Sequence, residues 1–558
     1  MGDRTITARA IADRHLDQVA AQDPLAAAWL GLHPGGDRQP DLSPEGFEAQ
    51  ADTARRTLAA LDAAPAPEDS ADRNCASLLR DRLSAELALH DSGENYRQLR
   101  NIGAHVHQVR DVFTFMPTAT EDDWAAVAGR LRHLPGALAG YRTTLAEGID
   151  RKLLAAPRQA AAVVDQLTAW TGEADGSAGW FAGFVAAGPE RLRGELDAAA
   201  AEATAATAAF RDWLRDGYAP ATLGTPDAVG RDRYRLAVRH HAGADLDLDE
   251  AYAWAWEEFH RTAAEMRAEA ERVLPGAGVL EAVDHLHRHG HAVEGEEAIR
   301  GWLQQVMEQA ITALDGTHFD ISGPLRRVES HLAPAGSAAA PFYSAPSLDF
   351  SRPGRTYLPT LGRTTFPTWH LVTTWYHEGV PGHHLQLARW TELAGELSRY
   401  QTTVGRVSAN IEGWALYAER LMDELGHFED PAHRLGFLDE QMLRTIRVII
   451  DIGMHLGLAV PADSGFHPGE RWTPELATAF MAAHSGTPAG KRDSEIVRYL
   501  GWPGQAIGYK LGERVWLRGR EEARRRLGGA FDLKRWHTAA LSQGSLGLDD
   551  LAAQLGTL

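Results

Sequence analysis

Hydrophobic side chains recur at intervals of three and four residues through most of the first 220 positions, which predicts a series of amphipathic helices. The clearest segments are 5–22, 72–91, 123–146 and the alanine-rich 190–216. A second helical block begins near residue 245 and continues, with breaks, to about residue 314. The stretch 217–227 has little periodicity. We therefore predict an N-terminal helical lobe over residues 1–220 and a second lobe over residues 221–558.

The pattern changes between about residues 316 and 366, where aromatic residues, Thr and Pro alternate with turn signals. This composition predicts a small sheet of short strands. An exposed edge strand around residues 341–357 could hold an extended peptide by main-chain hydrogen bonds. The helical pattern resumes at Trp369 and continues nearly to the end. The predicted fold is mainly α, with helical lobes around a cleft and one small sheet.

Composition narrows the class of protein and of partner. The hydrophobic fraction is 44% and the charged fraction 24%, as in globular proteins. A formal net charge of −20 argues against nucleic acid or an anionic membrane as a partner. Cys75 is the only cysteine, so a disulfide within the chain is excluded. The start of the chain lacks an apolar run of signal-peptide length, and we expect a cytoplasmic protein.

The candidate chemistry begins with the pair His377-Glu378. In the motif H-E-x-x-H, two histidines four residues apart share one helix face, bind zinc, and enclose a glutamate base. Here the fourth position is Pro381, so the strict motif is absent. His383 would lie on the wrong side of a regular helix, and His384 about 10 Å further along its axis. An unbroken helix could not bring either histidine to a metal at His377.

Pro381-Gly382 offers a way to bring a second histidine back. Proline removes a backbone donor and clashes with the preceding turn, whereas glycine tolerates the resulting conformation. A local bulge of the helix would return His383 to the side of His377. We therefore interpret the segment as an expanded metal motif, with His384 as the alternative ligand.

A catalytic zinc site needs a third protein ligand and an open position for water. Glu412, near the start of the amphipathic segment Asn410-Ile-Glu-Gly-Trp-Ala-Leu-Tyr-Ala-Glu, is the candidate. Glu419 lies on nearly the same stripe two turns later and could hydrogen-bond a histidine ligand. Gly413 would permit close packing against the helix of the histidine motif. We predict one Zn²⁺ per chain, bound by His377, His383 and Glu412.

A polar stripe follows on an otherwise apolar helix. Arg444, Arg447, Asp451 and His455 recur at intervals of three and four. They are interpreted either as part of the active site or as a buried ladder of ion pairs.

Further candidates lie in the segment 498–512. Pro503 could begin a helix on which Gln505 and Tyr509 share a face. The Tyr509 hydroxyl is a suitable donor to the oxyanion formed when water attacks a carbonyl. Lys510 or Arg498 could bind a substrate carboxylate. Gly508 and Gly512 would leave room for a close neighbour.

The motifs His-Glu-x-x-Pro-Gly-His-His-x-Gln and Glu-Gly-Trp-Ala-Leu-Tyr-x-Glu resemble those of DUF885, a bacterial family defined by a domain of unknown function. The resemblance extends over most of the chain, from Asp23 to beyond Trp502. This family is grouped with gluzincin-type metallopeptidases. The resemblance implies a helical zincin-like fold, bound zinc and hydrolase chemistry, without naming a substrate.

The sequence thus predicts a zinc-dependent hydrolase of amide bonds, most simply a peptidase acting on short peptides near their C-terminus. Glu378 would be the general base and Tyr509 the oxyanion donor. Arg498, Gln505 and Lys510 would bind the substrate. One alternative is a hydrolase of a non-peptide amide in specialised metabolism. The other is a helical binding protein with a degenerate metal site.

Overall fold

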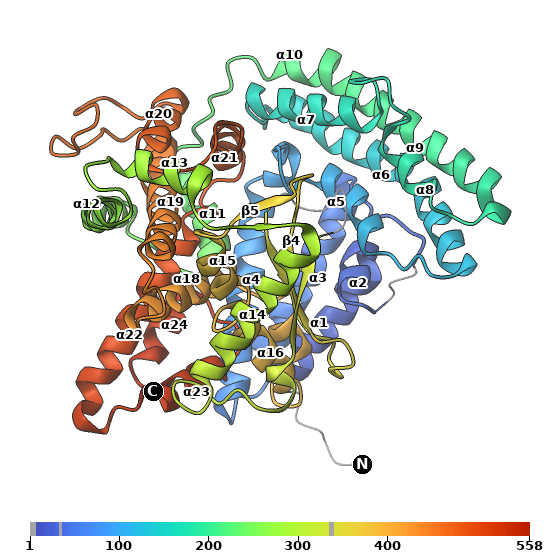
Figure 1. Cartoon of the computed structure of the whole chain (residues 1–558). Coiled ribbons are helices and arrows are strands. Elements are labelled where there is room, and N and C mark those ends of the chain that lie inside the picture. Colours follow the sequence, from blue (N-terminus) through green and yellow to red (C-terminus); the bar gives the residue numbers. More distant parts are fainter. Residues whose placement is uncertain (1–6, 33–35, 334–339) are drawn as a thin grey trace. The chain divides into compact units, whose positions relative to one another are not determined.

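The computed structural model describes residues 7–32, 36–333 and 340–558 (Figure 1). The chain divides into two compact units. The first unit consists of residues up to Pro65, Arg82–Val229 and Val497–Trp502. The second consists of Ala66–Asp81, Gly230–Ile496 and Pro503–Leu558. The division near residue 230 lies close to the predicted boundary at residue 220. Two segments depart from that prediction, because 66–81 belongs to the second unit and 497–502 to the first.

The first unit is helical, and its core forms where the long helices α6 and α9 pack together. Trp124, Tyr141 and Phe210 are among the buried side chains of this core. The helices that lie wholly in this unit are α1 (Ala8–Gln22), α2 (Pro24–Trp29), α3 (Pro44–Asp62), α5 (His105–Asp111), α6 (Glu121–Arg151), α7 (Pro157–Trp170), α8 (Gly179–Val185), α9 (Arg193–Trp213) and α10 (Ala219–Ala221).

The second unit carries the candidate site. Helix α4 (Ser70–Asp91) starts in this unit and ends in the first, as does α21 (Ala489–Gly501). The other helices of the second unit are α11 (Arg231–Ala242), α12 (Leu248–Val273), α13 (Val279–His289), α14 (Glu296–Leu314), α15 (Leu371–Glu378), α16 (His383–Glu392), α17 (Arg399–Thr402), α18 (Ser408–Glu424), α19 (Pro431–Leu456), α20 (Pro474–His484), α22 (Gly508–Leu527), α23 (Leu533–Leu541) and α24 (Leu548–Leu555).

The helix boundaries follow local chemistry. The Thr120 hydroxyl accepts a hydrogen bond from the Asp123 N–H at the start of α6, and the Asp123 carboxylate accepts one from the Thr120 N–H. Pro431 occupies the first turn of α19, where its missing donor costs nothing. The predicted helices 72–91, 123–146 and 190–216 correspond to α4, α6 and α9. The predicted helix 5–22 corresponds to α1, although its first two residues lie outside the described residues.

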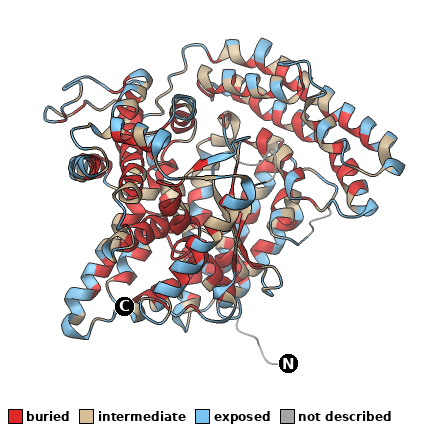
Figure 2. Ribbon diagram, in the orientation of Figure 1, coloured by how far each residue is buried: buried red, intermediate tan, exposed pale blue. Residues whose placement is uncertain are grey.

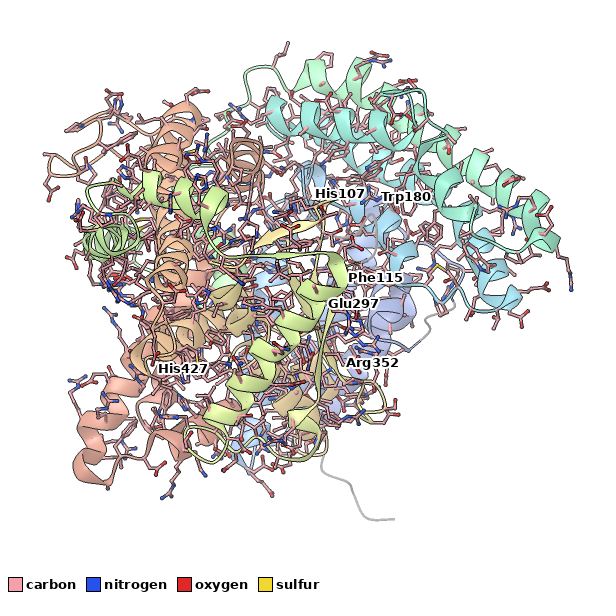
Figure 3. All side chains as sticks on the ribbon, viewed as in Figure 1. His107, Phe115, Trp180, Glu297, Arg352 and His427 are labelled. Carbon is pink, nitrogen blue, oxygen red and sulfur yellow. The ribbon has the colours of Figure 1, made fainter. Side chains whose placement is uncertain are left out.

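The predicted small sheet is present and mixed in direction. Strand β4 (Gly354–Leu358) is central, parallel to β2 (Val328–Leu332) and antiparallel to β3 (Phe342–Ser344). The prediction of one edge strand over 341–357 is thus correct for β3 and wrong for β4, which is the central strand. Residues 334–339 of the predicted sheet region lie outside the described residues. Arg352, labelled in Figure 3, donates to the Ser344 hydroxyl and the Ala345 carbonyl and so ties the connection between β3 and β4.

A second ladder was not predicted. Strand β1 (Ala292–Glu294) pairs antiparallel with β5 (Thr365–Pro367). The β1 segment lies between two strongly periodic helical stretches, and its three residues are too few to give an alternating signal. This ladder brings the chain back beside α14 immediately before α15 begins.

Helices α18 and α22 approach each other at two glycines. A Cβ atom on Gly512 would lie 2.0 Å from the Ala409 carbonyl oxygen, and one on Gly413 would lie 2.4 Å from the carbonyl carbon of Gly512. Gly413 therefore permits close packing against α22, and the prediction that it contacts the helix of the histidine motif is wrong. The close neighbour expected beside Gly512 is α18.

Most residues of the helices around the candidate site are buried, and red predominates along α15, α18 and α19 (Figure 2). Trp414 and Trp516 pack with ring centroids 4.9 Å apart, and His537 stacks on Phe319 at 4.5 Å. Buried aromatic side chains thus pack around the helix that carries Glu412. Over the described part of the chain, every helix is too short or too polar to cross a membrane.

Candidate metal centre

The histidine motif is divided between two helices. Helix α15 ends at Glu378, and α16 begins at His383. The predicted single helix with a local bulge is wrong, because the chain leaves the helical path over Gly379–Gly382. The outcome for His383 is nevertheless as predicted, because the break returns it to the side of His377, with ring centroids 4.8 Å apart.

The break is held by specific contacts. The Trp414 indole N–H donates to the carbonyl oxygens of Pro381 and Gly382, at 3.0 Å each. A Cβ atom on Gly382 would lie 2.0 Å from the His377 carbonyl oxygen, so only glycine fits. The tryptophan of the Glu-Gly-Trp-Ala segment therefore fixes the geometry of the distant histidine motif.

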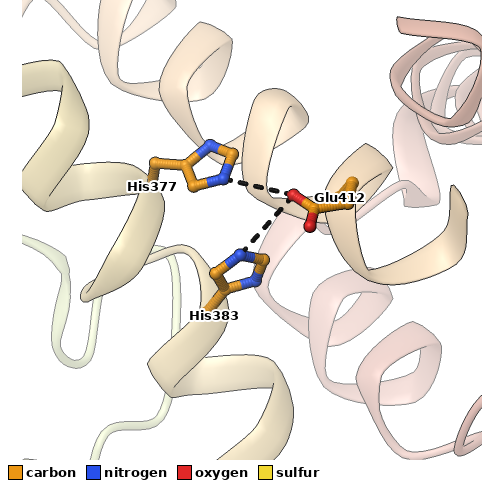
Figure 4. Close-up of side chains that lie close together, drawn as sticks. All are labelled: His377, His383 and Glu412. Atoms are coloured by element: carbon orange, nitrogen blue, oxygen red, sulfur yellow. Dashed lines mark ion pairs between the residues drawn. The ribbon is translucent and has the colours of Figure 1, made fainter. Parts of the chain in front are cut away.

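Three candidate ligands converge at the break. The Glu412 Oε2 atom lies 3.4 Å from His377 Nε2 and 3.7 Å from His383 Nε2 (Figure 4). One ligand atom from each of the three residues lies within 4.8 Å of the other two. The structure thus brings together the three residues predicted as metal ligands.

These distances fit a shared cation. In a tetrahedral zinc site with bonds of about 2.0–2.2 Å, ligand atoms lie roughly 3.3–3.6 Å apart. Direct hydrogen bonds between imidazole and carboxylate would be shorter, near 2.8 Å. The donor set of two imidazoles and one carboxylate is also that of a catalytic zinc site.

Glu419 orients the His377 ring through the ring nitrogen that does not face Glu412. The His377 Nδ1–H donates to Glu419 Oε1 at 2.7 Å, which leaves Nε2 to face Glu412. The Thr373 hydroxyl donates to the other carboxylate oxygen of Glu419 at 2.5 Å. Glu419 was predicted from the sequence, whereas Thr373 was not. Thr373 lies four residues before His377, on the same helix face, and this spacing could have identified it as a neighbour of the histidine.

His384, the alternative ligand, is engaged elsewhere. Its Nε2–H donates to the Leu325 carbonyl oxygen, and its Nδ1 accepts from the Tyr343 hydroxyl, each at 2.9 Å. The side chain is fully buried. Both ring nitrogens thus bond to Leu325 and Tyr343 and anchor α16 to them, and His383 is the better candidate ligand.

Burial and neighbouring charges strongly shift the pKa values of the cluster. Burial alone would lower the pKa of His377, but the carboxylates of Glu412 and Glu419 outweigh it and raise this pKa to about 10. Burial lowers the pKa of His383 to about 4. Burial would raise the pKa of Glu412, but His377 and His383 lower it to about 2. Glu412 is therefore ionised, as a metal ligand must be.

Glu378 follows the first histidine directly and is buried at the end of α15. Burial raises the pKa of its carboxyl group to about 8, and the negative charge of Glu412 adds to this effect. His377 and Arg444 oppose the rise with their positive charges. Such a carboxyl group can both take up and release a proton near neutral pH.

The polar stripe on α19 is largely a ladder of internal contacts. Arg447 forms an ion pair with Glu495 at 2.9 Å. The Asp451 carboxylate accepts from the Tyr234 hydroxyl at 2.6 Å and from the Gly504 N–H at 2.9 Å. These contacts support the ion-pair interpretation for the far end of the stripe.

The segment after Trp502 differs from the prediction. Helix α22 begins at Gly508, not at Pro503, and Gly504 has a left-handed φ of +73° that interrupts the helical path. Gln505 therefore lies in a turn, and the prediction that it shares a helix face with Tyr509 is wrong. Tyr509 occupies the first turn of α22, and the Arg447 guanidinium lies 5.0 Å from the centre of its ring.

Lys510 is not placed to bind a substrate. Its side chain is 0% exposed, and Nζ lies 2.9 Å from Glu258 and 2.5 Å from Glu513. Nζ also donates a hydrogen bond to the side-chain oxygen of Gln441 at 2.5 Å. The predicted role in carboxylate binding is therefore wrong, because all of these partners are internal to the second unit.

Arg498 lies in the part of α21 that belongs to the first unit. Its guanidinium lies 4.7 Å from the centre of the Tyr499 ring, and its side chain is buried. The candidate metal centre belongs to the second unit. A substrate contact for Arg498 stays a prediction.

Comparisons with known proteins identify relatives of similar architecture. A candidate lipoprotein from Colwellia psychrerythraea has a TM-score of 0.83 and 21% identity, with 99% of this chain and 98% of that chain covered. A candidate lipoprotein of unknown function from Shewanella oneidensis has a TM-score of 0.76 and 18% identity, with 98% and 99% covered. At these identities the likeness shows the fold alone. None of the curated proteins matches the sequence.

The family comparison covers nearly the whole chain. The match extends over residues 24–555, includes the candidate metal centre, and carries the description "Bacterial protein of unknown function". It agrees with the resemblance carried by the two motifs. The chain therefore belongs to the DUF885 family.

Proposed function

We propose that the protein is a zinc-dependent hydrolase that cleaves amide bonds, with short peptides as substrates. The observation that carries this proposal is the convergence of His377, His383 and Glu412 at distances suited to one cation. Glu378, a potential base, directly follows the first of these ligands. The mainly helical fold is compatible with the zincin-like architecture that the motifs imply.

When bound by these three residues, Zn²⁺ would polarise a substrate carbonyl and lower the pKa of a water molecule. Glu378 would accept the proton of the attacking water and deliver it to the leaving amine. Glu419 would hold the His377 ring in the tautomer whose Nε2 carries a lone pair. Tyr509 is proposed to donate its hydroxyl to the developing oxyanion.

Two features favour a peptide as the substrate. Strand β3 is an edge of the three-stranded sheet, so one side of its backbone is not paired within that sheet. Its central residue, Tyr343, contacts His384 in α16, the helix that begins at His383. An extended chain pairing with β3 would lie close to the helix that carries a candidate ligand.

The test combines metal analysis with a search for substrates. Protein purified without added zinc is analysed by mass spectrometry for transition metals, and about one zinc per chain is expected. A peptide library and a panel of small acylated amines are then incubated with it. Zinc with cleavage of peptides supports the proposal, whereas zinc with cleavage of acylated amines alone would assign a non-peptide substrate. Protein without stoichiometric metal would contradict the proposal.

A further inference from the structure

Arg444 lies close to the candidate metal centre without being a candidate ligand. It belongs to α19, which packs against α15 and α18, the helices of His377 and Glu412. Its positive charge lowers the pKa of the carboxyl groups of Glu412 and Glu419. Arg444 thus belongs to the side of the site that α19 forms.

The guanidinium of Arg444 has unused hydrogen-bonding capacity. Nη1 pairs with the Glu440 carboxylate one turn earlier and donates to the Glu440 carbonyl oxygen at 3.1 Å. The Nε–H is buried, and none of the described residues accepts a hydrogen bond from it. The side chain is 14% exposed. One donor edge is therefore enclosed without an acceptor, which is costly unless a ligand supplies one.

Other cations gather beside Arg444. Arg447 lies one turn further along α19, over the ring of Tyr509. Lys491, at the start of α21, is exposed, and its pKa is lowered by partial loss of hydration and by the charges of Arg447 and Arg444. Neighbouring carboxylates offset part of this positive charge, because Arg447 pairs with Glu495, and Glu495 and Asp439 act on the pKa of Lys491 in the opposite sense.

We propose that Arg444 binds a carboxylate of the substrate through the edge of its guanidinium that carries the free Nε–H. The proposal rests on the proposed function and narrows it to peptides or acyl amino acids with a free carboxylate near the cleaved bond. A guanidinium presents paired donors in the geometry of a carboxylate, which an ammonium cannot match. This role replaces the one predicted for Lys510.

The experiment measures binding without requiring turnover. One library of N-acetylated tripeptides with free carboxylates is compared with the same library amidated at the C-terminus. Wild-type protein and the variants Arg444→Gln, Arg444→Lys and Arg434→Gln are mixed with each library. Peptides retained on ultrafiltration are quantified by mass spectrometry. Arg434 is the matched control, because it lies on the same helix and pairs with Asp423, Glu265 and Glu269.

Wild type is expected to retain acids over amides by about tenfold or more, the scale of one charge-assisted pair. Arg444→Gln should abolish this preference, and Arg434→Gln should keep it. Arg444→Lys retains the charge and the pairing with Glu440, and should preserve folding with part of the preference. Equal retention of acids and amides by wild type, or an undiminished preference in Arg444→Gln, would overturn the proposal. Retention of acids without cleavage of any peptide would contradict the proposed hydrolase while leaving the role of Arg444 intact.

Discussion

The imidazole of His377 and the carboxylate of Glu419 are joined by a buried hydrogen bond of 2.7 Å between Nδ1 and Oε1. The two residues lie on α15 and α18, so this bond fixes the ring of a candidate ligand from a second helix. An imidazole held in this way keeps Nε2 aimed at the metal and gains basicity from the carboxylate.

Replacing Glu419 by Gln should therefore weaken zinc binding while leaving the three ligands in place. We expect a loss of about 10–100-fold in affinity, the usual range for such outer partners. Competition with a chromogenic chelator measures the affinity. Glu424→Gln is the control, because Glu424 lies on the same helix and pairs with Arg520. Equal affinity in the two variants would show that Glu419 does not support the ligand.

The two adjacent histidines of α16 should behave differently. His383→Ala removes a candidate ligand and should abolish stoichiometric zinc. His384→Ala removes the contacts to Tyr343 and Leu325, so it should lower thermal stability but keep about one zinc per chain. Metal content measured on folded, gel-filtered protein separates the two effects. The reverse result would assign the metal to His384.

Glu378→Gln keeps the shape of the side chain but cannot accept a proton from water. We expect zinc content near wild type and hydrolysis reduced by ~10² or more. Glu392→Gln, at the far end of α16 in an ion pair with Arg389, should leave both quantities unchanged. Turnover close to wild type in Glu378→Gln would remove this residue from the mechanism.

Lys510 should matter for folding and not for substrate recognition. Lys510→Met removes a fully buried cation from Glu258 and Glu513, although both keep their ion pairs with Arg420. We expect a loss of about 1–3 kcal/mol in the free energy of unfolding. Urea denaturation measures this change. Lys534→Met, which removes an exposed pair with Asp320, serves as the control and should be nearly neutral. A Lys510→Met protein as stable as wild type would contradict the structural role.

The buried carboxyl group of Asp439 predicts a pH-dependent difference in stability. Burial raises its pKa from 3.8 to about 6, against the hydrogen bond from Gly486 and the charges of Lys491 and Arg444. The folded state therefore binds this proton more tightly than the unfolded state, and its stabilising contribution is lost as the pH rises from about 4 to 6. Asp439→Asn does not titrate, so its stability relative to wild type should increase by about 2 kcal/mol over that range. Urea denaturation at several pH values checks this, and a difference independent of pH would disprove it.

The sequence was sufficient for the features that depend on local periodicity and composition. The helix that carries Glu412 and Glu419 has a regular apolar stripe, and it forms as α18. The same periodicity indicated that the two carboxylates face one direction. A disturbance of the helix at Pro381-Gly382 was also predictable, because proline and glycine act on the backbone itself.

The features that depend on distant partners were not predictable in this way. Lys510 looked available because the carboxylates that bury it come from α12 and from the next turn of its own helix. The bulge expected at Pro381 became a full separation of two helices, because Trp414 supplies a donor to the break from α18. The same limit applies to Arg444, because the burial of its Nε–H is apparent only in the folded structure.

The separation of α15 from α16 also changes what a bound ion would do to the chain. Under the proposed function, an ion held by both His377 and His383 closes a short loop that contains no regular hydrogen-bonded structure of its own. It would then act as a reversible cross-link, and part of its binding free energy would be spent on restricting the motion of that loop. Removal of the ion by a chelator should loosen the segment between α15 and α16 while the two helices stay folded. Faster hydrogen exchange at the amides of Gly379, Gly382 and His384 would then report the loss of the ion.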